Sequence, residues 1–133
     1  MLITGSCYCN RIRYESTGEL QASIQCHCRE CQYITGGAQN NIIIVPKSGF
    51  SFTKGKPTTY RRRDWEQPVT RFFCNQCGTG IGTETPSRPK SMVIKVGTLD
   101  NPKLYTPTVA IFTIDKQPFH HIPDNVKQFE RRP

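Results

Sequence analysis

The stretch SIQCHCREC, residues 23–31, places three cysteines within six residues, around one of only three histidines in the chain. Thiols this close together can ligate a metal ion, form a redox pair with a third thiol to spare, or belong to the core. The chain has seven cysteines, and an odd number cannot be fully paired within one chain. In a reducing compartment such thiols are more often metal ligands or catalytic groups than disulfides. We therefore interpret these cysteines as metal ligands.

The composition describes one small domain. The 133 residues, 35% of them hydrophobic, can bury only a modest core, and ten glycines and ten prolines favour short strands over long helices. The N-terminus lacks the basic start and apolar run of a signal peptide. No stretch approaches the about 20 apolar residues of a membrane helix. We expect a single domain over residues 1–133 that is soluble, cytoplasmic and free of membrane contact.

Strand signals recur along the chain, while no window carries a sustained helical period. Alternation in RIRYE places Ile12 and Tyr14 on one face, and the β-branched run NNIIIVP is typical of a buried strand that Pro46 ends. Further strands are expected in FSFTKG (50–55), VTRFFC (69–74), SMVIKVGTL (91–99) and TVAIFTID (108–115). The pattern predicts an all-β fold of compact, stacked antiparallel sheets. We expect at most one helical turn after Cys31, another near residues 124–130, and a loose C-terminal tail over residues 124–133.

Four cysteines form two pairs that are far apart in sequence, Cys7 with Cys9 and Cys74 with Cys77. The second pair has the spacing of a zinc knuckle, in which Gly78 lets the backbone curl under the metal. A structural zinc ion takes four tetrahedral ligands, so the first pair can complete the site and close a loop of more than 60 residues. The spacing alone equally permits the first pair to join the middle cysteines and leave the second pair without partners.

The middle cysteines Cys26, Cys28 and Cys31 can hold a second zinc ion with one position open, as in catalytic sites. His27 lies between two ligands of an extended segment, so we expect its side chain to point to the opposite face rather than to ligate. Three thiolates around Zn²⁺ leave a net charge of −1, which favours activation of a substrate thiol over activation of water.

The three cysteine blocks together resemble the glutathione-dependent formaldehyde-activating enzyme family. The resemblance rests on GSCYCNRIRY (5–14), CHCRECQYITGGA (26–38) and FFCNQCGTGI (72–81), and extends to KQPFHHIPDNVKQF (116–129). It implies a β-tent-like fold with zinc at the sheet edges and two Zn²⁺ ions per chain. The implied ligands of the structural zinc are Cys7, Cys9, Cys74 and Cys77. Those of the catalytic zinc are Cys26, Cys28 and Cys31.

The activity that the resemblance implies is that of a carbon–sulfur lyase. S-(hydroxymethyl)glutathione would form from, or split to, glutathione and formaldehyde, so the expected partners are a small glutathione-like thiol and an aldehyde. Two positions depart from the family pattern: Asn10 stands where glycine is frequent, and Gln32 where a basic residue is common. Asn tolerates the same backbone region as Gly. The loss of a basic residue at position 32 is expected to change how an anionic substrate is held.

The basic balance suggests a different kind of partner. Eighteen Lys and Arg against ten Asp and Glu give a net charge of +8, but seven thiolates on two Zn²⁺ ions would lower it to +5. In YRRRDW (60–65), three arginines lie between aromatic residues and could bind substrate carboxylates or nucleic-acid phosphates. A solvated hairpin is the plainer interpretation, and a nucleic-acid partner is not expected. The alternative function is a zinc-stabilised module that binds nucleic acid or protein, with both metals structural.

Overall fold

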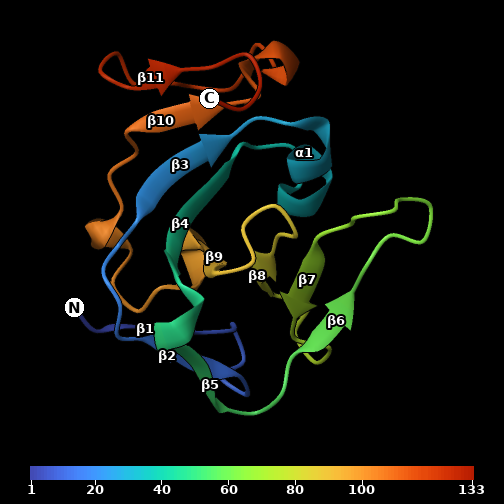
Figure 1. Cartoon of the computed structure of the whole chain (residues 1–133), viewed down its shortest axis with the longest axis vertical. Coiled ribbons are helices and arrows are strands. Elements are labelled where there is room, and N and C mark those ends of the chain that lie inside the picture. Colours follow the sequence, from blue (N-terminus) through green and yellow to red (C-terminus); the bar gives the residue numbers. More distant parts are fainter.

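The computed structural model describes all 133 residues, which form two β-sheets, one α-helix and four short 3-10 helices (Figure 1). The smaller sheet has the order β1–β2–β5, and the larger one the order β11–β10–β3–β4–β9–β8–β7–β6. The strands of the smaller sheet are β1 (Ile3–Ser6), β2 (Arg13–Ser16) and β5 (Phe50–Lys54). Those of the larger sheet are β3 (Ala22–Cys26), β4 (Asn40–Pro46), β6 (Thr58–Tyr60), β7 (Thr70–Phe73), β8 (Gly80–Glu84), β9 (Ser91–Lys95), β10 (Val109–Ile111) and β11 (Lys127–Gln128).

The expected fold class is confirmed, because short strands account for most of the regular structure. Ile12 and Tyr14 are both buried, as the alternation of their segment predicts. β4 ends at Pro46, where the missing N–H of proline closes the strand. The chain then turns after β5 at Gly55, whose φ of 69° lies in the left-handed region that glycine adopts without strain.

The helical segments differ from the expectation. α1 (Arg29–Thr35) begins before Cys31 instead of following it, because Cys28 caps the helix: its sulfur accepts a hydrogen bond from the Cys31 N–H at 3.2 Å. The 3-10 helices are η1 (Lys47–Gly49), η2 (Val96–Thr98), η3 (Pro102–Leu104) and η4 (Thr113–Asp115). η2 and η4 shorten the strands expected over 91–99 and 108–115. None of the helices has the length and hydrophobicity needed to span a bilayer.

The C-terminal segment is also ordered differently from the prediction. Residues 124–130 contain β11 rather than a helical turn, and β11 pairs in parallel with β10. The tail is held by the backbone, since the Phe129 N–H donates to Ala110 at 2.9 Å and Thr113 donates to Phe129 at 3.1 Å. β10 is also parallel to β3, so the larger sheet is mixed rather than purely antiparallel. Figure 1 shows these strands at one end of the larger sheet and β6 and β7 at the other.

The main core lies between the two sheets and draws residues from both. Its buried members are Ile3, Cys7, Ile12, Tyr14, Ile43, Val45, Cys74, Ile81, Met92, Ile94, Val96 and Leu99. β4 is buried on both faces, because Ile42 and Ile44 belong to a second cluster with Ile24. This two-sided burial explains why the β4 sequence is a continuous apolar run rather than an alternating one.

Candidate metal centres

Two distant turns bring four cysteines together. Cys7 and Cys9 lie in the turn between β1 and β2, and Cys74 and Cys77 in the turn between β7 and β8. All four sulfurs lie within 4.8 Å of one another; Cys7 and Cys9 are 3.6 Å apart, and Cys9 and Cys74 are 3.8 Å apart. Tetrahedral zinc with Zn–S bonds of about 2.3 Å requires neighbouring sulfurs about 3.8 Å apart. The four-sulfur group therefore fits a zinc ion.

Each of the two turns needs one residue with a left-handed backbone. Asn10 has φ 66° and Gly78 has φ 77°, and their N–H groups donate to the carbonyls of Cys7 and Cys74 at 3.1 and 2.8 Å. Asparagine is among the few residues that tolerate this region, so its presence where glycine is frequent leaves the turn intact. The Ile12 N–H also donates to the Cys7 sulfur at 3.4 Å, which stabilises the thiolate that a metal requires.

The four-sulfur group is continuous with the core. Cys7 and Cys74 are buried in the main core, whereas Cys9 is exposed. Thr79 joins the two turns directly, because its hydroxyl accepts from the Tyr8 N–H at 3.1 Å and lies 3.1 Å from the Cys77 sulfur. The group thus links the smaller sheet to the larger one, across 65 residues between Cys9 and Cys74.

The second group has three sulfurs. Cys26 is the last residue of β3, Cys28 caps α1, and Cys31 lies in its first turn; the three sulfurs lie within 4.8 Å of one another. No histidine, carboxylate or fourth cysteine joins them. Hydrogen bonds from Cys26 and Cys31 lower the pKa of Cys28 to about 2, while the same crowding raises the pKa of Cys26. Without a cation, Cys28 is thus favoured as a thiolate while its neighbours stay protonated. A divalent cation would instead favour the thiolate form of all three cysteines. The donor set therefore fits zinc, with one tetrahedral position not supplied by the chain.

His27 does not ligate the three-sulfur group, in agreement with the orientation expected for it. Its ring is fully buried, with Nδ1 2.9 Å from Nδ1 of His120 and Nε2 3.1 Å from the Gln25 side chain. His120 in turn lies 2.8 Å from the Gly37 carbonyl oxygen through Nε2. Burial lowers the pKa of His27 to about 4. The pair holds the segment near residue 120 against the end of β3, and no local pattern indicates a contact between residues 93 positions apart.

Gln32 is not placed to hold a substrate. It is buried, and its amide nitrogen donates to the carbonyls of His27 at 3.0 Å and Asp115 at 2.9 Å. Position 32 therefore carries no charge toward a substrate in this chain, and the effect of its missing basic residue on an anionic substrate stays a prediction. The arginine-rich segment is the loop between β6 and β7, in which Arg62 pairs with Asp64 at 2.9 Å and lies over the ring of Trp65 (Figure 1).

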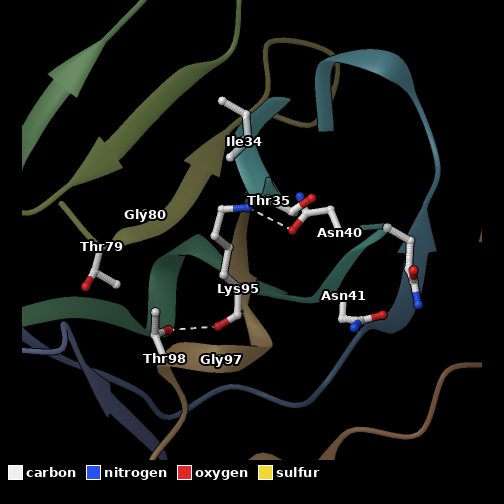
Figure 2. A pocket seen from close by; sticks show the side chains of 10 residues that line it. Ile34, Thr35, Asn40, Asn41, Thr79, Gly80, Lys95, Gly97 and Thr98 are labelled. Carbon is white, nitrogen blue, oxygen red and sulfur yellow. Dashed lines mark hydrogen bonds between the residues drawn. The ribbon is translucent and has the colours of Figure 1, made fainter. Parts of the chain in front are cut away.

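A hollow of about 360 Å³ is lined by ten residues, none of which is a cysteine (Figure 2). Its lining residues are Ile34, Thr35, Gln39, Asn40, Asn41, Thr79, Gly80, Lys95, Gly97 and Thr98. Asn40 connects it to the sulfurs, because its amide nitrogen lies 3.6 Å from the Cys31 sulfur while its amide oxygen accepts from Lys95 at 2.8 Å. Another hollow of equal volume is lined by Lys47, Ser48, Pro89 and Lys90. None of these four residues has a hydrogen bond to a cysteine sulfur.

The chain is thus a small β protein with one four-sulfur and one three-sulfur group. The family model for the glutathione-dependent formaldehyde-activating enzyme matches residues 2–115. The chain therefore belongs to this family. Its fold is similar to the crystal structure of a Rhodobacter sphaeroides protein, a Northeast Structural Genomics target, with TM-score 0.61 and 21% identity over 75% of this chain and 92% of that one. Among curated proteins, none matches this chain significantly.

Proposed function

We propose that this protein is a zinc-dependent carbon–sulfur lyase that acts on a thiol–aldehyde adduct such as S-(hydroxymethyl)glutathione. In this proposal Cys7, Cys9, Cys74 and Cys77 hold a structural zinc, and Cys26, Cys28 and Cys31 hold a catalytic one. The observation that carries the proposal is the unequal donor count, four sulfurs in one group and three in the other. Family membership supports the chemistry of glutathione and formaldehyde.

A zinc ion bound by three thiolates supplies a position at which a substrate thiol is stabilised as its thiolate. Donor groups of the chain itself position the sulfurs. The Cys31 N–H donates to the Cys28 sulfur, and the Asn40 amide faces the Cys31 sulfur, so both thiolates keep a donor. In the condensation, the substrate sulfur forms a bond to the aldehyde carbon. The carbonyl electron pair moves to oxygen, which takes up the proton that the thiol released.

The decisive experiment is metal analysis of the purified protein before and after incubation with glutathione and a mild chelator. We expect two zinc ions per chain, of which one exchanges readily and is protected by glutathione. A Cys28→Ser variant should keep the inert ion, lose the exchangeable one, and lose acceleration of the condensation of glutathione with formaldehyde. Unchanged condensation rate and zinc content in this variant would overturn the proposal.

The same measurement addresses the binding-module alternative, for which two inert ions and no response to glutathione are expected. All seven cysteines are free of disulfides. Because free thiols persist in reducing compartments, we further propose a cytoplasmic location, with a small thiol and an aldehyde as partners.

A further inference from the structure

Lys95 is a half-buried cation without a carboxylate partner. It lines the hollow beside the three-sulfur group, and its ammonium donates to the Asn40 side chain at 2.8 Å (Figure 2). None of the five ion pairs of the molecule includes it, whereas its basic neighbour Arg71 is paired with Glu30 at 2.8 Å. A cation held away from bulk water without a counter-ion is costly unless an anion completes its environment.

Strand register places this ammonium on the same face of the larger sheet as the sulfurs. Cys26 is opposite Asn40 across β3 and β4, and Ile42 is opposite Lys95 across β4 and β9. Because residues two apart in a strand share a face, Cys26, Asn40 and Lys95 all project to one side. The stem of Lys95 passes over Gly80, where an added Cβ would lie 3.2 Å from Lys95 Cε, so this glycine leaves the side chain room to reach the hollow.

The distance between the ammonium and the sulfurs suits a small molecule. Asn40 lies 3.6 Å from the Cys31 sulfur through one amide atom and 2.8 Å from Lys95 through the other. The two amide atoms are about 2.2 Å apart, so the Lys95 nitrogen lies within about 9 Å of the Cys31 sulfur. One small thiol can therefore place its sulfur at the three-sulfur centre and a second polar group at Lys95.

The positive charge of Lys95 would offset the negative charge of a metal-loaded three-sulfur group toward an anionic substrate. Three thiolates around a divalent ion carry a net charge of −1, which repels an anionic substrate. Burial lowers the pKa of Lys95, as does Arg71 nearby, while the thiols of the three-sulfur group act in the opposite direction. The positive charge of Lys95 is thus only partly compensated.

We propose that Lys95 binds a carboxylate of the substrate thiol, so that this enzyme selects small acidic thiols over neutral ones of the same size. The inference rests on the proposed function, because it requires the substrate sulfur to bind at the three-sulfur centre. Lys95 is then a specificity-determining residue supplied by β9, on the opposite side of Asn40 from Cys31.

The test uses protein in which Co²⁺ replaces zinc, so that sulfur-to-cobalt absorption reports thiol binding without turnover. Each acid is compared with its own amide: N-acetylcysteine with N-acetylcysteine amide, and 3-mercaptopropionate with 3-mercaptopropionamide. Glutathione is the larger acidic thiol. We expect wild-type protein to bind at least one acid about 10-fold or more tightly than its amide, since hydrogen bonds to charged groups contribute on this scale. Lys95→Met and Lys95→Gln should abolish the preference, and Lys54→Met, on β5 of the other sheet, should keep it.

Metal content and thermal unfolding of both Lys95 variants establish that they fold and hold two ions. If Lys95 served only to hold Asn40 and the three-sulfur group in shape, its loss would weaken acids and amides alike, and that outcome would overturn the inference. Equal binding of acids and amides by the wild type would overturn it too, while leaving the proposed function standing. If no thiol changes the cobalt spectrum, the proposed function fails and the inference fails with it.

Discussion

Replacing Cys9 and Cys77 together by serine tests the structural role assigned to the four-sulfur group. Cys9 is exposed and Cys77 half-buried, so the double substitution opens no cavity in the core. It leaves only Cys7 and Cys74 as ligands, too few to hold zinc against a chelator. The site closes a loop of 65 residues between Cys9 and Cys74, so its loss frees the unfolded chain from that constraint.

The closure term alone can be estimated from chain entropy. A permanent link over a loop of this length is worth about 4 kcal/mol of unfolding free energy. For a domain of this size each kcal/mol corresponds to about 3–5 °C, so the expected fall in Tm is about 12–20 °C. That is a large part of the total stability of about 5–15 kcal/mol that such domains possess.

The matched control is the double substitution of Cys28 and Cys31 by serine. It also removes two sulfurs and one zinc ion, but the three-sulfur group spans only residues 26–31, and a link that short is worth about 2 kcal/mol. Serine also remains a good helix N-cap at position 28. Thermal unfolding followed by circular dichroism, with zinc content measured for each protein, should show the first variant losing about twice as much Tm. The reasoning is refuted if the control loses as much or more, or if the first variant loses its zinc and keeps the wild-type Tm.

Three further predictions concern residues around the two centres. His120→Ala should lower stability by about 1–3 kcal/mol, because the buried His27 Nδ1 loses its partner, yet leave two zinc ions per chain in metal analysis. Hydrogen bonds from Thr4 and Arg13 hold the pKa of Asp100 below its usual range, so Asp100 contributes stability above about pH 4 that is lost as pH falls through its folded pKa. The wild type should therefore exceed Asp100→Asn in unfolding free energy by less than about 1 kcal/mol, because the Arg13–Asp100 pair is exposed. Urea unfolding should show this difference disappearing as the pH is lowered. A difference that grows at low pH would contradict the role given to Asp100. Gly78→Ala should lower the unfolding free energy by about 1–2 kcal/mol from backbone strain alone, because no atom lies near the added Cβ. It should also speed the release of zinc. Gly36→Ala, at φ 80°, should lower the unfolding free energy by the same amount without changing zinc release.

Local rules account for the parts of the fold and site that the sequence made predictable. Alternation identified the buried face of β2, and proline and glycine marked the ends of β4 and β5, because these signals depend only on neighbouring residues. The grouping of cysteines as four and three could be proposed because tetrahedral zinc limits the number of ligands, and the structure brings the same seven sulfurs together in those groups. The start of α1 differs from the expectation because Cys28, a candidate metal ligand, also caps the helix.

Contacts that depend on register or on distant pairing were outside the reach of local rules. Nothing in the segment SMVIKVGTL indicates that Lys95 lies beside Asn40, since this follows from how β9 aligns with β4. The parallel pairing of β10 with β3 and β11 likewise arises from segments that are far apart in the chain. The same limit applies to Gln32: its closeness to Cys31 in sequence does not indicate that its side chain bonds the His27 carbonyl.

The two cysteine groups differ in the way that their proposed roles require. The four-sulfur group joins turns from both sheets and buries two of its sulfurs in the main core, so loss of a metal bound there would loosen the fold. The three-sulfur group is contained in one strand end and one helical turn, whose hydrogen bonds do not depend on the other sheet. A metal bound there could therefore exchange, or exchange a ligand, while the fold persists. A lean core accounts for the first arrangement, and the second lies next to Asn40, which lines the hollow together with Lys95.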